Sequence, residues 1–434
     1  MKVVEIKPRK LKGTIHVPSS KSYAHRALLA ALLADGISTV YDVTLCDDVM
    51  ATLRAIEALG AKVEYIVDKR PDLFTLNITG STPLNVTDKI IDCRQSATTL
   101  RFFIPLVLTT NESFVFTAQG NLPSRPLDDM YEILKQDYIV YKNKDGKLPL
   151  HLKGLLRGGT YYMDTSITSQ TISAMLFTLP LLESDSKIKL TQKLSSKNYV
   201  DMTLSMLKHC GIHIDCLSEA GEFFIPGKQQ YQPFDYRLEG DYSSAAFWLC
   251  ACAMGSEVLS TGLKVKSLQA DRVFLNILSR MGAKIIKQGN GLKVRAEEPL
   301  KEVTIDVDGA PDLVPVLAVL AASLEGITQL TGLRRLQYKE TDRVKTTMNM
   351  ISSLGGDIVQ MSDKLIIRGT GSLQGGTVHT GGDHRIAMAG AIASTICKDN
   401  VVVTYANCVD KSYPMFWDDF QKVGGEIEEY YMDG

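Results

Sequence analysis

The chain has 434 residues, of which 45% are hydrophobic and 22% charged, and its formal net charge is −1. This length exceeds what one hydrophobic core usually supports, so we expect two or three domains. The balanced charge, without a clustered basic face, argues against nucleic acid as a partner. No apolar run has the length of a signal peptide or a membrane span, so we expect a cytoplasmic protein.

The eight cysteines are scattered through the chain. This is typical of a reduced cytosolic protein and suggests no disulfide framework. Residues 209–216 hold two histidines and two cysteines, but their pattern indicates a helix end followed by a strand. Side chains alternate along a strand, so these candidate ligands would point to both faces of a sheet. We therefore expect no metal and no cofactor.

One signature recurs along the chain: an apolar helix ends, a glycine follows and an alternating strand begins. The glycine position is occupied by Gly60, Gly211, Gly282, Gly355 and Gly424. Glycine fits here because it enters the left-handed region freely. The copies lie roughly 70 residues apart except for one double gap, where residues 136–140 (Gln-Asp-Tyr138-Ile-Val) read as a degraded copy. The sequence therefore predicts six units.

Each unit is predicted to run strand, helix, strand, helix, strand, strand. The period is far longer than that of a solenoid, so we expect the six units to form two globular halves of three. Turn-forming residues at 229–239 separate the third unit from the fourth. The N-terminal strand ends at Val17–Pro18, and the turn at Pro18–Ser20 would let this strand belong to the later half.

The helices of each unit begin with small, hydroxyl or charged residues. The first helices begin at Ser20–Ser22, Ser96–Thr98, Thr168–Gln170, Asp241–Ser244, Gly309–Asp312 and Gly382–Arg385. The second helices begin at Cys46–Asp48, Ser124–Pro126, Ser196–Tyr199, Lys266–Ser267, Lys339–Arg343 and Lys411–Pro414. A helix start leaves N–H groups unpaired and carries a partial positive charge, so it favours anions.

The most highly charged of these starts lies within residues 337–344, just before an amphipathic run. Lys339 and Arg343, together with the N–H groups of a helix start, predict a site for a multiply charged anion. Glu340 is the anomaly, because a carboxylate held among cations suggests proton transfer.

Taken in order, these segments resemble the 5-enolpyruvylshikimate-3-phosphate (EPSP) synthase family of enolpyruvyl transferases. The resemblance is carried by Pro18–Arg26, Leu122–Pro126, Thr168–Gln170, Ser196–Tyr199, Lys339–Arg343, Gly382–Arg385 and Lys411–Pro414. It implies an α/β fold, a two-domain inside-out α/β barrel of six βαβαββ repeats with three per domain. Residues 19–236 would form one domain and residues 1–18 with 237–434 the other. The active site would lie in the cleft between them.

The resemblance also implies the reaction. The enolpyruvyl group of phosphoenolpyruvate would pass to the 5-hydroxyl of shikimate 3-phosphate by addition and elimination, with release of phosphate, in chorismate and aromatic amino acid biosynthesis. Both substrates carry several negative charges, and a dense array of Arg and Lys offsets their repulsion. We expect a monomer that uses small-molecule substrates only, with no nucleic acid and no membrane.

The resemblance assigns the binding residues. Shikimate 3-phosphate would be bound by Lys21, Ser22, Arg26, Thr168, Ser169, Gln170, Ser196, Tyr199, Asp312 and Lys339. Phosphoenolpyruvate would be bound by Lys21, Ala97, Arg125, Gln170, Arg343, Arg385 and Lys411. Arginine suits this task because its planar fork meets a carboxylate or a phosphate with two hydrogen bonds.

The resemblance also implies three catalytic residues. Asp312 would accept the 5-hydroxyl proton, while Glu340 and Lys21 would protonate the methylene carbon and later remove a proton. The positive charges of Lys339 and Arg343 favour the ionised form of a neighbouring carboxylate until bound anions cancel them. We therefore expect Glu340 to become a competent acid only in the closed, liganded site.

The chain departs from the family pattern in one loop. The family has Gly-Asn where Arg94–Gln95 stand here, and glycine where Ala97 stands. Glycine would let the backbone approach phosphoenolpyruvate closely. The methyl group of Ala97 takes up that space, so we expect only weak inhibition by glyphosate, an extended analogue that competes for this site.

Two alternatives are weaker. A UDP-N-acetylglucosamine enolpyruvyl transferase would share the fold, but the patterns at Lys21–Arg26 and Lys411–Pro414 argue against it. The reactive-cysteine loop of that enzyme is also missing near Ala118–Gln119. A non-catalytic anion-binding relative is suggested by the altered loop at 94–97. The presence of Asp312, Glu340 and Lys411 makes it the less favoured reading.

Overall fold

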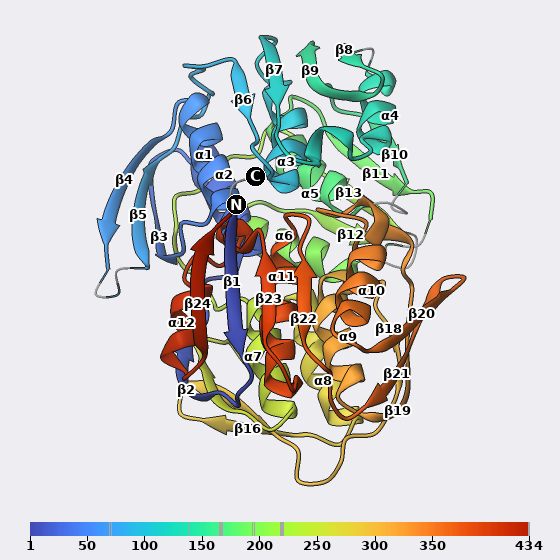
Figure 1. Cartoon of the computed structure of the whole chain (residues 1–434). Helices are drawn as coiled ribbons and strands as arrows, with labels where there is room; N and C mark the ends of the chain where they lie inside the picture. The colour runs from blue at the N-terminus through green and yellow to red at the C-terminus, as the bar shows by residue number, and fades with distance from the viewer. Residues whose placement is uncertain are drawn as a thin grey trace. The chain divides into compact units, whose positions relative to one another are not determined.

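The computed structural model describes residues 1–68, 70, 72–137, 139–164, 168–192, 194, 196–217 and 221–432 (Figure 1). It divides into two compact units, Ser20–Leu238 and Met1–Ser19 with Glu239–Gly434. We call the first the N-terminal unit and the second the C-terminal unit.

The N-terminal unit contains six helices and three four-stranded sheets in its described residues. Its helices are α1 (Lys21–Leu33), α2 (Asp47–Ala58), α3 (Ala97–Val107), α4 (Asp128–Gln136), α5 (Gln170–Thr178) and α6 (Lys197–His209). Its strands are β3 (Ile37–Val43), β4 (Lys62–Val67), β5 (Phe74–Thr79), β6 (Ile90–Asp92), β7 (Ser113–Thr117), β8 (Val140–Lys144), β9 (Lys147–Lys153), β10 (Thr160–Met163), β11 (Ser186–Leu190), β12 (Asp215–Leu217), β13 (Glu222–Ile225) and β14 (Asp235–Arg237). The sheet orders are β14-β3-β5-β4, β6-β7-β9-β8 and β10-β11-β13-β12.

The described part of the C-terminal unit is built in the same way. Its helices are α7 (Tyr242–Ala253), α8 (Val273–Arg280), α9 (Val314–Ala322), α10 (Arg343–Ser353), α11 (His384–Ala393) and α12 (Phe416–Lys422). Its strands are β1 (Lys2–Lys7), β2 (Lys12–His16), β15 (Glu257–Thr261), β16 (Lys284–Gln288), β17 (Gly291–Arg295), β18 (Thr304–Asp306), β19 (Glu325–Thr331), β20 (Asp357–Met361), β21 (Lys364–Thr370), β22 (Gly376–His379), β23 (Val401–Thr404) and β24 (Glu426–Tyr431). The sheet orders are β16-β17-β15-β2, β18-β19-β21-β20 and β22-β23-β1-β24.

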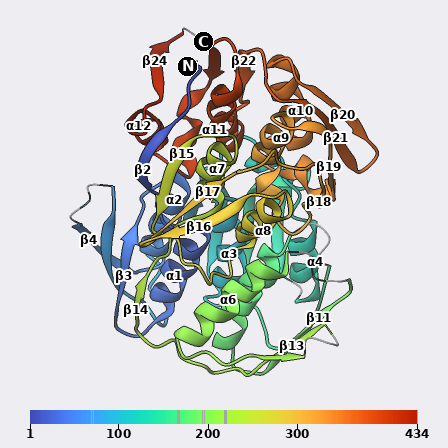
Figure 2. The ribbon, with the colours of Figure 1, turned by 90° about the horizontal axis from the view of Figure 1, so that it is seen from below.

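Each sheet is one βαβαββ repeat, as expected. Every sheet has one parallel pair of strands, at one end of its strand order, and its other pairs are antiparallel. Three repeats take a strand from a distant part of the chain. β14 pairs with β3 and β2 with β15, as Figure 2 shows, and β1 pairs with β23 and β24. The chain therefore leaves the C-terminal unit after β2 and returns to it after β14.

The first helix of each repeat lies inside its unit. In the C-terminal unit α7, α9 and α11 pack against one another, and every residue of α9 is buried. A helix that is apolar on all sides belongs in the core. In the N-terminal unit α3 packs against α5 in the same way. Edge strands such as β4 are largely exposed, so helices lie inside and sheets outside, which is the predicted inside-out α/β fold.

The recurring glycine takes the predicted backbone conformation in five repeats. The φ angles are 101° at Gly60, 81° at Gly211, 102° at Gly282, 80° at Gly355 and 91° at Gly424. These values lie where glycine is favoured at the end of a helix. In the degraded copy, α4 ends at Gln136, and Tyr138 lies outside the described residues. Within the described ranges, none of the helices is both long and apolar enough to cross a membrane.

Candidate active site

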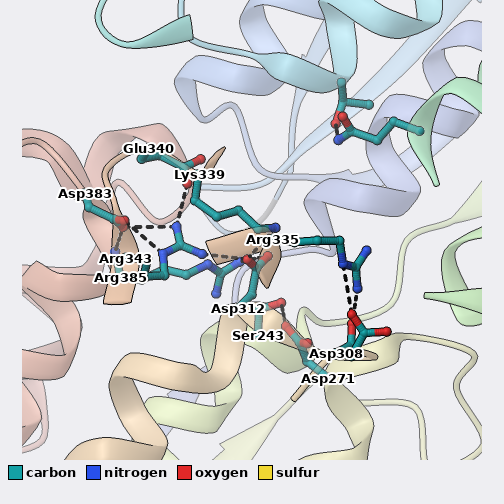
Figure 3. Close-up of polar contacts among 12 residues, drawn as sticks. Ser243, Asp271, Asp308, Asp312, Arg335, Lys339, Glu340, Arg343, Asp383 and Arg385 are labelled. Atoms are coloured by element: carbon teal, nitrogen blue, oxygen red, sulfur yellow. Dashed lines mark hydrogen bonds and ion pairs between the residues drawn. The ribbon is translucent and has the colours of Figure 1, made fainter. Parts of the chain in front are cut away.

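The guanidinium of Arg343 lies at the centre of a buried charge cluster in the C-terminal unit (Figure 3). Arg343 is the first residue of α10 and is fully buried. Its Nε donates to Asp383 (2.9 Å), its Nη1 to Asp312 (2.7 Å), and its Nη2 to Glu340 (2.5 Å) and Asp383 (3.2 Å). One side chain therefore holds three carboxylates from three segments of the chain.

Asp312 is bound by three cations. It belongs to the 3₁₀ helix η4 (Pro311–Leu313). Besides its bond from Arg343, its Oδ1 pairs with Lys339 (3.2 Å) and its Oδ2 accepts from Arg385 (3.0 Å). Burial acts to raise the pKa of Asp312, but the charges of Arg385, Lys339 and Arg343 outweigh it and hold this pKa well below its usual range. Asp312 is thus a weak base until another anion draws these cations away.

Lys339 and Glu340 lie in the turn between η5 (Arg334–Tyr338) and α10. The helix begins within the expected stretch, at Arg343. Asp342 is its N-cap and accepts a hydrogen bond from the backbone N–H of Lys345 (3.3 Å). Burial lowers the pKa of Lys339, although Asp312 opposes this effect. The charged pair therefore precedes the helix, and Glu340 reaches Arg343 across one turn.

Asp383 joins two helices of the site, although the sequence suggested no role for it. It is the N-cap of α11, and its Oδ1 accepts from the backbone N–H of Arg385 (3.0 Å). The same carboxylate binds Arg343 at the start of α10. Asp383 therefore fixes the starts of α10 and α11 relative to each other. Lys411, the last residue of η7 (Ala406–Lys411), is buried, and η7 packs against α11.

Arg335 is a second residue that the sequence did not reveal. It lies in η5, and its Nε donates to Asp308 Oδ1 (3.1 Å) while its Nη2 donates to the Asp308 carbonyl. Asp308 precedes η4, which carries Asp312, and η5 leads to Lys339. Arg335 therefore ties together the two loops that bring Asp312 and Lys339 into contact (Figure 3).

In the N-terminal unit, Lys21 is the first residue of α1. Its Nζ pairs with Asp48 Oδ2 (2.7 Å), in the first turn of α2. Sequence analysis assigned Asp48 no role at the site, because an acid in the first turn of a helix is common. The structure shows that Asp48 is the acid that holds the candidate catalytic lysine.

Arg26 brings α1 and α6 together. Its Nη1 donates to the Ser22 carbonyl (2.7 Å), its Nη2 to the Tyr199 carbonyl (3.0 Å) and its Nε to Thr203 Oγ1 (2.9 Å). Its guanidinium also lies over the ring of Phe102, 5.4 Å from the centroid. Burial lowers the pKa of Arg26 to about 10. Three predicted ligands of shikimate 3-phosphate, Ser22, Arg26 and Tyr199, therefore meet here.

Gln170 links the starts of α3 and α5. Its Nε2 donates to Thr98 Oγ1 (3.0 Å), the residue after half-buried Ala97, and its backbone N–H donates to Thr168 Oγ1 (3.1 Å). Arg101, which the sequence analysis missed, donates to Gln170 Oε1 (3.4 Å) and to the carbonyl of Pro126 (2.8 Å), which follows Arg125. Arg101 thus connects the segments that carry Ala97, Arg125 and Gln170.

Ser169 and Ser196 are buried residues at helix starts. Ser169 is the N-cap of α5, and Ser196 that of α6. Ser196 has φ 54° and ψ 46°, a left-handed conformation that non-glycine residues seldom adopt. Such conformations persist only where the surrounding structure enforces them, and they cluster at functional sites. α5 packs against α6, and α6 against α1. The predicted residues of the N-terminal unit therefore lie on helices that pack together.

The chain is similar over its whole length to proteins of one family. The family model described as EPSP synthase (3-phosphoshikimate 1-carboxyvinyltransferase) matches residues 6–420. A 3-phosphoshikimate 1-carboxyvinyltransferase of Clostridium kluyveri is 43% identical over 430 residues, with 99% of each chain covered. One of Clostridium novyi is 41% identical, with 100% of each chain covered. The chain belongs to the EPSP synthase family.

Solved structures agree with this fold. The EPSP synthase of Acinetobacter baumannii superposes with a TM-score of 0.81 at 23% identity, covering 99% of this chain and 100% of that one. The enolpyruvyl transferase NikO of Streptomyces tendae also gives a TM-score of 0.81, at 15% identity, covering 100% of this chain and 99% of that one. At these identities the likeness concerns the fold.

We predict that Arg343→Ala destabilises this EPSP synthase family member by about 3–5 kcal/mol, because it leaves three carboxylates without their shared cation. The measurement is denaturant unfolding followed by tryptophan fluorescence. Both tryptophans, Trp248 and Trp417, belong to the C-terminal unit, so the signal reports the unit that contains Arg343.

The matched control is Arg368→Ala in the same unit. Arg368 pairs with Asp357 at 3.0 Å, but the two side chains are 65% and 50% exposed. Exposed pairs contribute at most about 1 kcal/mol. Equal losses in the two variants would show that the buried cluster is not a source of stability.

Proposed function

We propose that this chain transfers the enolpyruvyl group of phosphoenolpyruvate to the 5-hydroxyl of shikimate 3-phosphate and releases phosphate. Full-length similarity to 3-phosphoshikimate 1-carboxyvinyltransferases supports the proposal. The observation that carries it is the Asp312 carboxylate, bound at once by Arg343, Arg385 and Lys339. This arrangement combines a proton acceptor with cations for an anionic substrate.

The cluster suggests how Asp312 becomes a base. Four of the five N–H groups of Arg343 donate hydrogen bonds to Asp312, Glu340 and Asp383. Phosphoenolpyruvate would therefore compete with Asp312 for Arg385 and for the remaining N–H of Arg343. As the cations turn toward the substrate, the pKa of Asp312 rises. Asp312 then accepts the 5-hydroxyl proton of shikimate 3-phosphate while the oxygen of that hydroxyl attacks the enol carbon of phosphoenolpyruvate.

Protonation of the methylene carbon completes the addition, and loss of a proton with phosphate completes the elimination. Glu340 and Lys21 are the proposed proton carriers. Glu340 is held by Arg343 at 2.5 Å and Lys21 by Asp48 at 2.7 Å. In each case an ionic partner fixes the group before substrate arrives, which reduces the reorganisation needed at the reacting atoms.

Other residues of both units are proposed to bind the same pair of substrates. Shikimate 3-phosphate would contact Ser22, Arg26, Thr168, Ser169, Ser196, Tyr199 and Lys339, and phosphoenolpyruvate would contact Ala97, Arg125, Arg385 and Lys411, with Gln170 touching both. A cytoplasmic location and a monomeric state are further parts of the proposal. All eight cysteines are free thiols, which suits a reducing compartment.

The first experiment measures phosphate release from phosphoenolpyruvate by the full chain with two acceptors. We expect release with shikimate 3-phosphate and none above background with UDP-N-acetylglucosamine. Release with the second acceptor alone would replace the proposed substrate. No release with either, despite binding of both acceptor and phosphoenolpyruvate, would favour a non-catalytic anion-binding protein.

We predict that Glu340→Gln lowers kcat by at least about 100-fold, the usual contribution of a general acid or base. The amide keeps the shape of the side chain but cannot donate a carboxylic proton. The measurement is steady-state turnover, with exposed Glu325→Gln as the control. Near-normal turnover of Glu340→Gln, with unfolding like that of the parent chain, would remove Glu340 from the mechanism.

We predict weak inhibition of this chain by glyphosate and stronger inhibition of Ala97→Gly. One methyl group in a fitted pocket is worth about 10–200-fold in discrimination, and Ala97 is a half-buried residue at the start of α3. The measurement is the inhibition constant against phosphoenolpyruvate. Ala296→Gly, outside the helices and strands, serves as the control. Low-micromolar inhibition of the parent chain would contradict the prediction.

A further inference from the structure

Asp271 is a buried acid next to the Arg343 cluster, and the proposed mechanism does not use it. It lies in the 3₁₀ helix η3 (Ala270–Arg272) and is 1% exposed. Its Oδ2 accepts a hydrogen bond from the hydroxyl of Ser243, in the first turn of α7. Within the described residues, its Oδ1 has no hydrogen-bond partner. A buried carboxylate with an unused oxygen is costly unless a nearby charge or a bound proton compensates for it.

The charges that act on Asp271 come from several elements. Asp241 at the N-cap of α7 and Asp312 on η4 repel its negative form, whereas Arg385 on α11 attracts it. Arg272 is its neighbour in the chain. In Figure 3 the pair Ser243–Asp271 lies close to Asp312 and points toward it. Arg385 therefore interacts with two acids: it donates a hydrogen bond to Asp312 and attracts Asp271 through space.

Asp271 adds negative charge to a cluster that is already balanced. The cations Lys339, Arg343 and Arg385 are matched by ion pairs with three acids, Asp312, Glu340 and Asp383. Asp271 is a fourth acid, and its hydrogen bond comes from the neutral hydroxyl of Ser243. An anion that arrives at Arg385 brings still more negative charge to the same place. A proton on one of the acids is the simplest compensation.

Asp271 is suited to take that proton. Burial raises its pKa to about 6, with Asp312 acting in the same direction and Arg385 opposing. Asp312, by contrast, has a pKa held well below the usual range. Drawing Arg385 toward a bound anion weakens the attraction that favours ionised Asp271, so its pKa rises further. Near neutral pH, anion binding would then be coupled to proton uptake.

We propose that Asp271 is the charge-compensating residue of the Arg385 site, and that it binds a proton when an anion arrives and releases it when the anion leaves. The inference rests on the proposed role of Arg385 in binding phosphoenolpyruvate. Asp271 acts through Arg385 and is a positioning residue, because it does not touch the reacting atoms. The proton resides on a carboxylate oxygen of Asp271, and the Arg385 guanidinium, no longer attracted by a negative Asp271, turns to the anion.

The probe is inorganic sulfate, because its charge is constant between pH 6 and pH 8. Its affinity is obtained from the rise in unfolding temperature of the full chain with sulfate concentration. For the parent protein we expect affinity to fall as pH rises from 6 to 8, by up to about tenfold per pH unit if one proton accompanies each ion. Asp271→Asn should remove this slope and bind sulfate more tightly than the parent at pH 8.

Folding of the variant is checked in the same experiment. A carboxyl whose pKa is raised in the folded state binds more protons folded than unfolded. The stability that this shift costs is lost as the pH rises from the unfolded-state pKa of about 4 to the folded-state pKa of about 6, so the full cost is present at pH 8. Asparagine removes that cost, so Asp271→Asn should unfold at pH 8 at the parent temperature or above it. A fall in unfolding temperature at pH 8 would contradict this part of the argument.

Three controls separate the possible outcomes. Arg385→Ala should abolish the specific effect of sulfate; if it does not, the assignment of Arg385 fails and the inference with it. Ser243→Ala removes the hydrogen bond that lowers the pKa of Asp271. In this variant the sulfate affinity should still fall as the pH rises, but the fall should begin at a higher pH. His384→Asn replaces the titratable neighbour of Arg385 and should keep the slope. A slope that survives in Asp271→Asn, or is absent from the parent, overturns the proposal.

Discussion

The structure of the C-terminal site depends on one buried guanidinium and the acids around it. Removing an ion from water costs several kcal/mol, so the fully buried Arg343 is stable only because Asp312, Glu340 and Asp383 meet its N–H groups. These acids come from η4, from the turn before α10 and from the start of α11. The fork of Arg343 therefore fixes two successive repeats relative to each other and also positions Asp312 and Glu340, the acids proposed to take part in catalysis.

In the proposed mechanism, this arrangement also determines how the site responds to substrate. Its own carboxylates occupy the cations that a phosphate or carboxylate ligand would use, so the cluster is balanced before any ligand arrives. Binding is then an exchange of anions around fixed arginines, with little new ordering of side chains. Asp312 is the acid that would lose the most ion-pair contacts in the exchange, because three cations hold it. The same exchange that admits an anion would raise the basicity of Asp312.

Regular features of the sequence predicted the repeats, and tertiary contacts account for what it missed. The glycine after each helix, as at Gly60 or Gly355, has a local cause in the left-handed backbone, so it could be read directly. β14 is only three residues long and pairs with β3 almost 200 positions earlier, so no local pattern marked it. Asp383 and Asp271 likewise look like ordinary helix-start residues in the sequence, and Arg101 looks like an ordinary residue inside a helix. Their roles arise only from contacts between repeats.

The buried arginines of the two units have different hydrogen-bond partners, and the partners determine how each arginine can attract an anion. In the N-terminal unit, Arg26 and Arg101 donate their hydrogen bonds to carbonyl, hydroxyl and amide oxygens, and burial lowers both pKa values. Their hydrogen-bond partners are neutral, and Asp129 acts on Arg101 only through space, so the positive charge of these guanidiniums is less fully cancelled than that of Arg343 and favours an anion. In the C-terminal unit, carboxylates cancel the charge of Arg343 and Arg385. Anion affinity there depends on moving or protonating an acid, which makes this unit the one whose binding should respond to pH.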